Sequence, residues 1–238
     1  MAQVMRAVAR RIEGAAPDFV SQLSDDTRKI IDACRPFTMT SVERLEALIE
    51  AVRYVDARGI PGAVVECGVW RGGSSMAAML ASGAPGREFY LYDTFDGMSE
   101  PTGADRERGS GASAADMLST ADGDDLVWAR AGLDEVRRNV ASTGYPADLI
   151  HYVAGKVEDT IPGVAPPLIA VLRLDTDWYE STKHELAQLY PRLQPGGVLI
   201  IDDYGHWDGA RKAVDEYFAD SPILLNRIDY TGRVAIKA

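Results

Sequence analysis

The sequence has few cysteines and no long hydrophobic run, and each shortage excludes a class of protein. Its two cysteines, Cys34 and Cys67, cannot form a disulfide framework, and neither belongs to a CxxC pair of the kind that binds zinc. The longest apolar runs, such as residues 168–172, are the length of strands, whereas a membrane span needs about 20 residues. The N-terminus has no sustained apolar stretch before its arginine pair, so we expect no secretory signal and a cytoplasmic protein.

The sequence also has fewer basic residues than acidic ones. The 238 residues contain 25 Lys and Arg against 36 Asp and Glu, which gives a formal net charge of −11. Nucleic acids and anionic membranes bind basic faces, so we expect neither as a partner. Hydrophobic residues make up 46% and charged residues 26%, which is typical of a globular chain rather than a disordered one.

Beyond residue 60 the apolar pattern alternates between two periods. Short apolar runs predict strands at 63–69, 88–92, 149–153, 168–174 and 197–201. Amphipathic stretches between them predict helices at about 73–82, 124–141, 179–190 and 209–219. This alternation is typical of a parallel sheet that helices cover on both faces. The last two runs, 223–229 and 233–237, flank Tyr230-Thr231-Gly232 and predict a hairpin that ends the sheet antiparallel, as its sixth and seventh strands.

Two segments differ from this pattern. Residues 1–60 are predicted to form an N-terminal helical cap, because Ser41 is a capping-type residue and apolar side chains follow it at helical spacing. The break at Pro61-Gly62 then opens the main domain, residues 61–238. Residues 100–125 are rich in Gly, Asp and Ser and follow the second strand directly, so we interpret them as a lid.

Acidic residues follow most of the predicted strands. In an open parallel sheet, ligands bind beyond the carboxyl ends of the strands. Asp175 follows the fourth strand and Asp202-Asp203 the fifth, so adjacent strands would bring these carboxylates to one edge. Converging carboxylates repel one another unless a cation neutralises them, and Mg²⁺ prefers oxygen ligands. The open alternative is that Asp177 and Asp203 each cap the helix that follows.

The glycine-rich turn after the first strand points to a nucleoside cofactor. Gly68, Gly72 and Gly73 do not match the G-x-G-x-x-G dinucleotide pattern, and no Walker loop occurs. Glu66 would repel a pyrophosphate but attract the cationic groups of S-adenosylmethionine, whose carboxylate can bind backbone N–H groups at a helix start. Asp93 could bind ribose hydroxyls in several folds. An NAD-dependent oxidoreductase and a non-catalytic nucleotide-binding module therefore remain as alternatives.

Aromatic and basic side chains accompany the acids at this edge. Trp178 and Trp207 are predicted to contact ligand and Phe95 to pack in the core, because Trp combines a stacking face with a polar N–H. Arg173 is interpreted as an internal partner for an acid, and His206 lies beside the predicted metal site.

Four motifs resemble those of the macrocin O-methyltransferase family, the sugar O-methyltransferases of macrolide and aminocoumarin antibiotic pathways. They are VECGVWRGGS (65–74), DTFDGM (93–98), LRLDTDWYEST (172–182) and IDDYGHW (201–207). The resemblance runs from about Phe37 to the C-terminus. It implies a Rossmann-like class I methyltransferase fold, S-adenosylmethionine and Mg²⁺ as cofactors, a glycoside substrate and a homo-oligomer.

Carried over position by position, the resemblance assigns a cofactor site, a metal site and catalytic groups. The cofactor site would comprise Thr38, Met39, Glu66, Cys67, Gly68, Val69, Trp70, Ser74, Asp93, Thr94, Phe95, Asp96 and Gly97. The metal site would comprise Asp175, Asp202 and Asp203. Asp175 is the first choice as proton acceptor from the sugar hydroxyl, followed by Asp177 and then His206. The same metal chemistry suits a catechol or another phenolic diol, so that acceptor class stays open.

Overall fold

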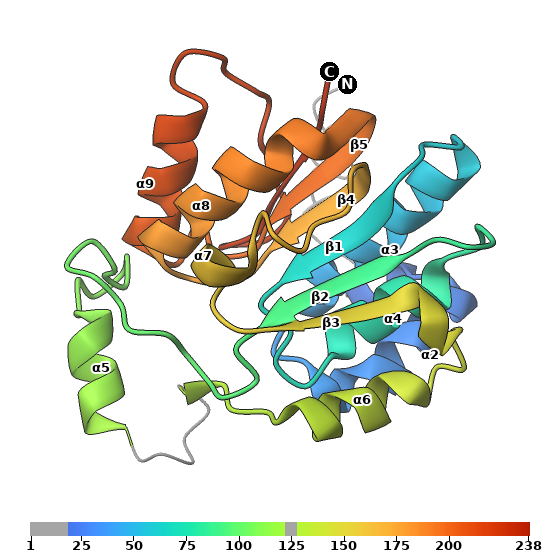
Figure 1. The fold of residues 1–238 in the computed structure, drawn as a ribbon, viewed down its shortest axis with the longest axis horizontal. Coiled ribbons are helices and arrows are strands. Elements are labelled where there is room, and N and C mark those ends of the chain that lie inside the picture. The colour runs from blue at the N-terminus through green and yellow to red at the C-terminus, as the bar shows by residue number, and fades with distance from the viewer. Residues whose placement is uncertain (1–18, 122–127) are drawn as a thin grey trace, which may run out of the picture.

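Seven strands form one sheet in the computed structural model, which describes residues 19–121 and 128–238 (Figure 1). They are β1 (Ala63–Cys67), β2 (Phe89–Asp93), β3 (Ile150–Ala154), β4 (Ile169–Leu174), β5 (Leu193–Ile201), β6 (Asn226–Arg227) and β7 (Arg233–Ile236). Their order is β3-β2-β1-β4-β5-β7-β6, and β7 runs antiparallel to both of its neighbours while β1 to β5 pair in parallel. The predicted mostly parallel sheet with an antiparallel C-terminal hairpin is confirmed.

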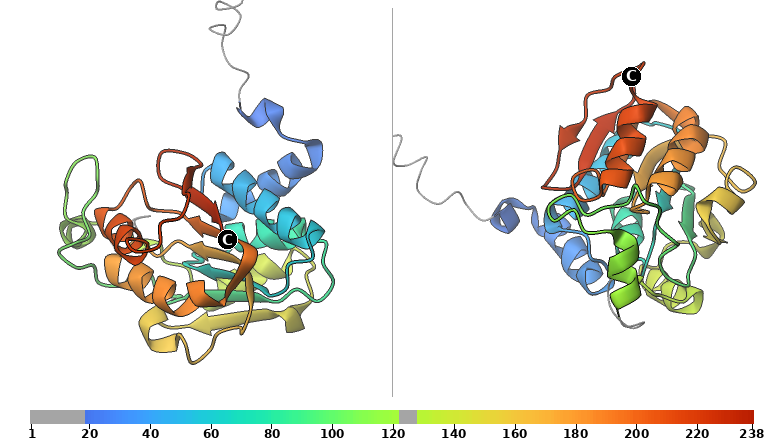
Figure 2. Two further views of the ribbon diagram at one scale, coloured as in Figure 1. Left: turned by 90° about the horizontal axis from the view of Figure 1, so that it is seen from above. Right: turned by 90° about the vertical axis from the view of Figure 1, so that its left-hand side faces the viewer.

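Helices cover both faces of this sheet, as Figure 2 shows. The α-helices are α2 (Asp25–Cys34), α3 (Val42–Ala57), α4 (Gly73–Ala81), α5 (Ala114–Thr120), α6 (Leu133–Ala141), α7 (Val157–Thr160), α8 (Tyr179–Leu189) and α9 (Asp208–Tyr217). Short 3₁₀ helices cover Phe19–Gln22, Arg35–Phe37, Ala147–Leu149 and Tyr190–Arg192. One hydrophobic core joins α2, α3, α4 and α6 to one face of the sheet, and a second joins α7, α8 and α9 to the other.

The local sequence explains where these elements begin and what they bury. Ser41 accepts a hydrogen bond from the backbone N–H of Arg44 at 3.2 Å and so starts α3, whose inner face from Leu45 to Val55 is buried. Every residue of β1 and β4 is buried, because helices cover both sides of these central strands. Fully burying one such Val or Leu side chain contributes about 1.5–3 kcal/mol.

The structure corrects two predicted boundaries. Helix α6 begins at Leu133, because residues 128–132 run past Gly97, where Met98 N–H donates to the Trp128 carbonyl at 3.0 Å. Residues 124–127 of the predicted helix lie outside the described residues. Strand β6 is shorter than the predicted run 223–229, because the Asp229 carboxylate accepts from the N–H groups of Thr231 and Gly232 and turns the chain.

The segment predicted as a lid contains an ordered helix. Helix α5 lies within it at one side of the molecule (Figure 1), and Glu107 forms a bridge with Trp207 in the loop after β5. Its last residues, 122–125, and the first 18 residues of the predicted cap are outside the described ranges. The division into a cap and a main domain stays a prediction, and α3 packs against α4 and β5.

The two cysteines are free and buried, which agrees with a chain that has no disulfide framework. Burial raises the pKa of the Cys34 thiol to about 12. A search of the described helices finds none with the length and apolar character needed to cross a membrane.

Candidate active site

A cavity of about 440 Å³ opens at the carboxyl ends of β1, β2, β4 and β5. This is the edge at which open α/β sheets bind ligands. Eight of the predicted cofactor residues line the cavity, namely Thr38, Met39, Gly68, Val69, Trp70, Ser74, Asp93 and Gly97. The predicted metal and catalytic residues line it too, namely Asp175, Asp177, Asp202, Asp203 and His206. The structure therefore places both predicted sites around one space.

Glu66 does not line this cavity. Its carboxylate is buried, with the Arg173 guanidinium and the Ser75 hydroxyl bound to it. The sequence argument that Glu66 attracts a cationic ligand is therefore not supported, because its charge is neutralised inside the protein. The register explains the pairing: Glu66 on β1 lies directly opposite Arg173 on β4.

The other predicted cofactor residues outside the cavity are Cys67, Thr94, Phe95 and Asp96. Cys67 is buried at the end of β1, and Phe95 is buried against the core as predicted. The Thr94 hydroxyl donates to the Gly97 carbonyl at 2.6 Å and so shapes the turn after β2. These residues support the cavity wall rather than forming it.

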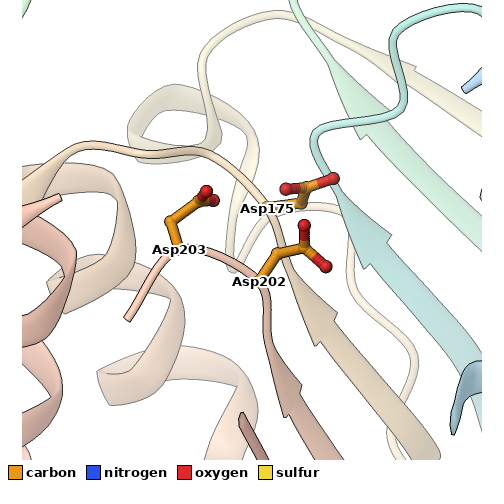
Figure 3. Close-up of side chains that lie close together, drawn as sticks. All are labelled: Asp175, Asp202 and Asp203. Atoms are coloured by element: carbon orange, nitrogen blue, oxygen red, sulfur yellow. The ribbon is translucent and has the colours of Figure 1, made fainter. Parts of the chain in front are cut away.

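Three carboxylates converge at the ends of β4 and β5 (Figure 3). Oxygens of Asp175, Asp202 and Asp203 lie within 4.8 Å of one another. The parallel register causes this, because Leu174 pairs with Ile201 and the next residue of each strand lies at the same edge. The Asp202 N–H donates to the Leu174 carbonyl at 2.9 Å, which keeps the two ends together. The predicted convergence is thus present in the structure.

Two arginines partly neutralise these carboxylates. Arg173, only 1% exposed, has Nη1 at 2.8 Å from Asp175 Oδ2 and Nη2 at 2.8 Å from Asp202 Oδ1. Arg44 binds the other oxygen of Asp202, and its Nε lies 3.0 Å from Asp229 Oδ2. The interpretation of Arg173 as an internal partner of an acid is confirmed.

Burial, together with the remaining negative charge, raises the pKa values of three carboxyl groups at this edge. Burial raises the pKa of Asp175 and of Asp203 well above the usual range, and neighbouring carboxylates act in the same direction. Burial, followed by the Asp175 charge, raises the pKa of Asp177 to about 7. The Oδ2 atom of Asp203 is buried without a hydrogen-bond partner among the residues that the structure describes. A cation at this edge would lower the pKa values of Asp175, Asp177 and Asp203 and would give the Asp203 Oδ2 atom a partner.

Helix capping does not explain these acids. Helix α8 begins after Trp178 and α9 after Trp207, and neither start has a side-chain cap from Asp177 or Asp203. The first N–H of α8, that of Tyr179, instead donates at 2.8 Å to Oδ1 of Asp105 from the lid segment. The capping alternative is therefore wrong.

Asp93 organises the turn after β1. Its Oδ2 accepts from the N–H groups of Val69 and Trp70 at 2.7 and 2.9 Å, and its Oδ1 accepts from Phe95 at 2.7 Å. Gly68 has φ +86°, and a Cβ there would lie 1.9 Å from the Asp175 carbonyl oxygen. The turn after β1 and the turn after β4 are therefore packed backbone against backbone.

Left-handed backbone marks the same edge. Trp70, Phe95 and Asp177 have φ of 48°, 53° and 66°, and they follow β1, β2 and β4 respectively. Non-glycine residues rarely adopt this conformation, which costs on the order of 1–3 kcal/mol and persists where the surroundings enforce it. Strain of this kind is typical of functional sites.

Sequence reasoning missed several residues of the cavity wall. The lid segment contributes Met117 and Leu118, and Met98 comes from the turn after β2; all three lie beside Trp178 and Trp207 in an apolar wall. The two tryptophan rings meet edge to face, with centroids 5.0 Å apart, so they pack against each other as well as lining the cavity. Arg44 and Tyr230 also line the cavity and were missed, because each comes from a segment remote from the strand ends. Asp105, a buried acceptor for the first N–H of α8, was missed for the same reason.

Comparison with known proteins identifies the family. The family model described as Macrocin-O-methyltransferase (TylF) matches residues 14–236. The chain belongs to this family. A relative from Streptomyces olivaceus, named 8-demethyl-8-(2,3-dimethoxy-alpha-L-rhamnosyl)-tetracenomycin-C 4'-O-methyltransferase, is 40% identical over 200 residues, covering 82% of this chain and 73% of the relative. Mycinamicin III 3''-O-methyltransferase from Micromonospora griseorubida is 34% identical and covers 76% and 69% of the two chains.

A solved structure supports the same relationship. The O-methyltransferase NovP is 32% identical, with a TM-score of 0.73, and the match covers 85% of this chain and 82% of NovP. This member of the macrocin O-methyltransferase family therefore has the expected class I fold, and it is an S-adenosylmethionine-dependent O-methyltransferase. The oxidoreductase and non-catalytic alternatives lose their support.

Proposed function

We propose that the chain uses S-adenosylmethionine and Mg²⁺ to methylate a sugar hydroxyl of a glycosylated natural product, as a tailoring step of antibiotic biosynthesis. One observation carries the proposal: the three converging carboxylates lie on the wall of the cavity that the turn after β1 also lines. The rhamnosyl group in the name of the S. olivaceus relative supports a sugar as the acceptor.

The residues at this edge fit a divalent cation. Carboxylate oxygens are the ligands that Mg²⁺ prefers, and the unpartnered Oδ2 of Asp203 is a buried acceptor without a donor among the described residues. Asp175, Asp202 and Asp203 would hold the ion. Mg²⁺ bound there supplies a Lewis acid that lowers the pKa of a hydroxyl.

The group that accepts the proton of the sugar hydroxyl should be a carboxylate that neither an ion pair nor the metal occupies. Asp175 is paired with Arg173 and is a predicted metal ligand, whereas Asp177 lines the cavity and forms no ion pair with the described arginines and lysines. We therefore assign Asp177 as the proton acceptor and Asp175 as a metal ligand. His206 comes third, because its Nε2 lies 3.9 Å from Glu107 Oε1 and is turned toward the lid segment.

The cofactor would bind at the turn after β1. Asp93 and Gly68 fix this turn, and Met39, which is 51% exposed beside it, is free to cover a bound nucleoside. Once the acceptor hydroxyl has given its proton to Asp177, the alkoxide and the sulfonium neutralise each other as the methyl group is transferred. Orientation of the reactants and removal of water beneath the apolar wall should therefore contribute on the order of several kcal/mol.

The test is a labelled-methyl assay over a panel of glycosides and catechols, read by mass spectrometry for a gain of one methyl group. We expect transfer to a glycoside, loss of transfer with EDTA and recovery with Mg²⁺. Full activity in metal-free protein would contradict the metal site, and transfer to catechols alone would favour the phenolic diol as acceptor. Asp177→Asn should lose turnover while calorimetry still shows S-adenosylmethionine binding.

The assembly is part of the same proposal. The family resemblance implies a homo-oligomer, and the exposed Leu224 and Ile236 near the C-terminal edge of the sheet are apolar groups that a second copy could cover. Light scattering should give a mass of at least two chains. A mass of one chain would remove the oligomer from the proposal.

A further inference from the structure

Glu185 is a buried acid that the proposed mechanism does not use. It belongs to α8, its exposed fraction is 0%, and it does not line the cavity. An acid without exposure costs free energy unless its polar atoms have partners. If this position served packing alone, a leucine would fill it without the cost of burying an acid. The presence of Glu185 therefore calls for a role beyond packing.

The partners of Glu185 come from two different strand ends. The Thr176 hydroxyl lies 3.0 Å from Oε1 and 3.2 Å from Oε2, directly after β4. Cys67, at the end of β1, is buried, and Glu185 is the largest contributor after burial to the raised pKa of its thiol. Glu185 thus lies beneath the point where the cofactor turn and the acidic turn meet.

Thr176 is the middle residue of the turn that carries the chemistry. It lies between Asp175 and Asp177, and Asp177 has the left-handed φ of 66°. The Trp178 N–H closes the turn on the Thr176 carbonyl at 2.7 Å, and the Asp175 N–H donates to the Cys67 carbonyl at 2.8 Å. The backbone bonds fix the two ends of this turn, and the Thr176 side chain is its only anchor to α8 among the hydrogen bonds of the described residues.

We propose that Glu185 is a positioning residue that holds the turn 175–177 in its strained conformation and ties it to the end of β1. Its bond to Thr176 sets the direction of the carboxylates on either side, and the Asp175 N–H, which donates to the Cys67 carbonyl, joins the turn so held to the end of β1. Because the expected effect on metal binding rests on the proposed function, the experiment has one readout that does not depend on it.

Three variants separate positioning from simple stability. Glu185→Gln keeps an acceptor and a donor of the same shape. The double variant Glu185→Leu with Thr176→Val removes both partners, so that no buried polar group is left unsatisfied between them and the fold is retained. Glu180→Gln changes an exposed acid on the same helix and is the matched control.

The first readout is hydrogen exchange of the full-length protein over residues 175–179, with the melting temperature measured in parallel. The double variant should exchange faster there without a fall in melting temperature, while Glu185→Gln and the control should exchange over these residues at the wild-type rate. The second readout is Mn²⁺ binding by electron paramagnetic resonance, which should weaken about tenfold to a hundredfold in the double variant alone.

The outcomes are distinct. Unchanged exchange over the turn in the double variant would overturn the positioning role, whatever the metal does. Faster exchange together with no Mn²⁺ binding in the wild type would uphold the positioning role and contradict the proposed metal site. Faster exchange that spreads through the whole molecule with a lowered melting temperature would show a general structural role and would also overturn the inference.

Discussion

Replacing Arg173 with methionine should be among the most destabilising single changes in this chain. The guanidinium is 1% exposed and forms ion pairs with Glu66, Asp175 and Asp202. It also donates to the Thr40 hydroxyl at 2.9 Å, which connects the start of α3 to the sheet. Methionine fills much of the same space but supplies no charge and no donor.

The magnitude follows from what the variant leaves behind. Removing one partner of a buried ion pair costs about 3–5 kcal/mol, because the other charge stays buried without compensation. Arg173 compensates three acids, so we expect the upper part of that range unless the acids take up protons. For a chain of this size, 1 kcal/mol shifts the melting temperature by about 2–4 °C, so the expected loss is about 10–20 °C.

Urea and thermal unfolding at pH 7 measure this effect. Arg211→Met is the matched control, because Arg211 is 37% exposed and lies 3.3 Å from Asp215, a surface pair that contributes at most about 1 kcal/mol. Adding Glu66→Gln to Arg173→Met should restore part of the lost stability, since it removes one uncompensated charge. A loss below about 1 kcal/mol for Arg173→Met would refute the view that this arginine neutralises the acidic edge.

The remaining predictions address four separate features. Gly68→Ala should abolish cofactor binding and cost more than about 1 kcal/mol from its positive φ alone, whereas Gly83→Ala, with no atom within 4 Å of the new Cβ, should leave the melting temperature unchanged. Asp105→Ala should cost about 0.5–2 kcal/mol and speed hydrogen exchange at the start of α8, where its carboxylate now accepts an N–H; unchanged exchange would contradict this. Burial raises the pKa of Glu185, so the folded protein keeps a proton that the unfolded chain releases above about pH 4.5, and wild-type stability falls with rising pH. Between about pH 4.5 and the pKa of Glu185 in the folded protein, the free energy of unfolding of Glu185→Gln should therefore rise relative to that of the wild type by about 1.4 kcal/mol per pH unit. If the two proteins showed the same dependence of unfolding free energy on pH, the prediction would be refuted. The Cys34 thiol, with its pKa raised to about 12, should not react with Ellman's reagent at pH 8 until the protein is unfolded, and rapid reaction would contradict its burial.

The order of strands and helices could be predicted because the central strands are buried on both faces. Such strands read as continuous apolar runs, and β1 and β4 show this directly. The start of α6 could not be predicted, because residues 128–132 have helical composition but are held by the turn after β2, where Trp128 accepts from Met98. Tertiary contacts, which no local pattern contains, decide such boundaries.

The acidic cluster could be predicted for a similar reason, and the direction of Glu66 could not. Parallel neighbours bring their carboxyl ends to one edge, so Asp175 and Asp202 had to approach each other once β4 and β5 were adjacent. The direction of Glu66 depends on its register opposite Arg173, and a shift of one residue would have turned its side chain to the other face of the sheet. Arg44 and Glu185 reach the site from helices whose packing only the folded chain defines.

The charges at this edge connect stability with function. Glu66, Asp175 and Asp202 pair with two arginines, Arg173 and Arg44, and Arg44 also pairs with Asp229. Asp177 and Asp203 have no ion pair among the described residues. Arginine therefore compensates the inner carboxylates, which stabilises the fold. Burial, followed by the charge of neighbouring carboxylates, raises the pKa values of the outer ones, Asp177 and Asp203. Adding a third buried arginine would neutralise the edge and remove the need for any ligand. The buried Asp203 Oδ2, which has no donor among the described residues, instead leaves part of the negative charge uncompensated, as a site for the cofactor's sulfonium and for the Mg²⁺ that the proposed function requires.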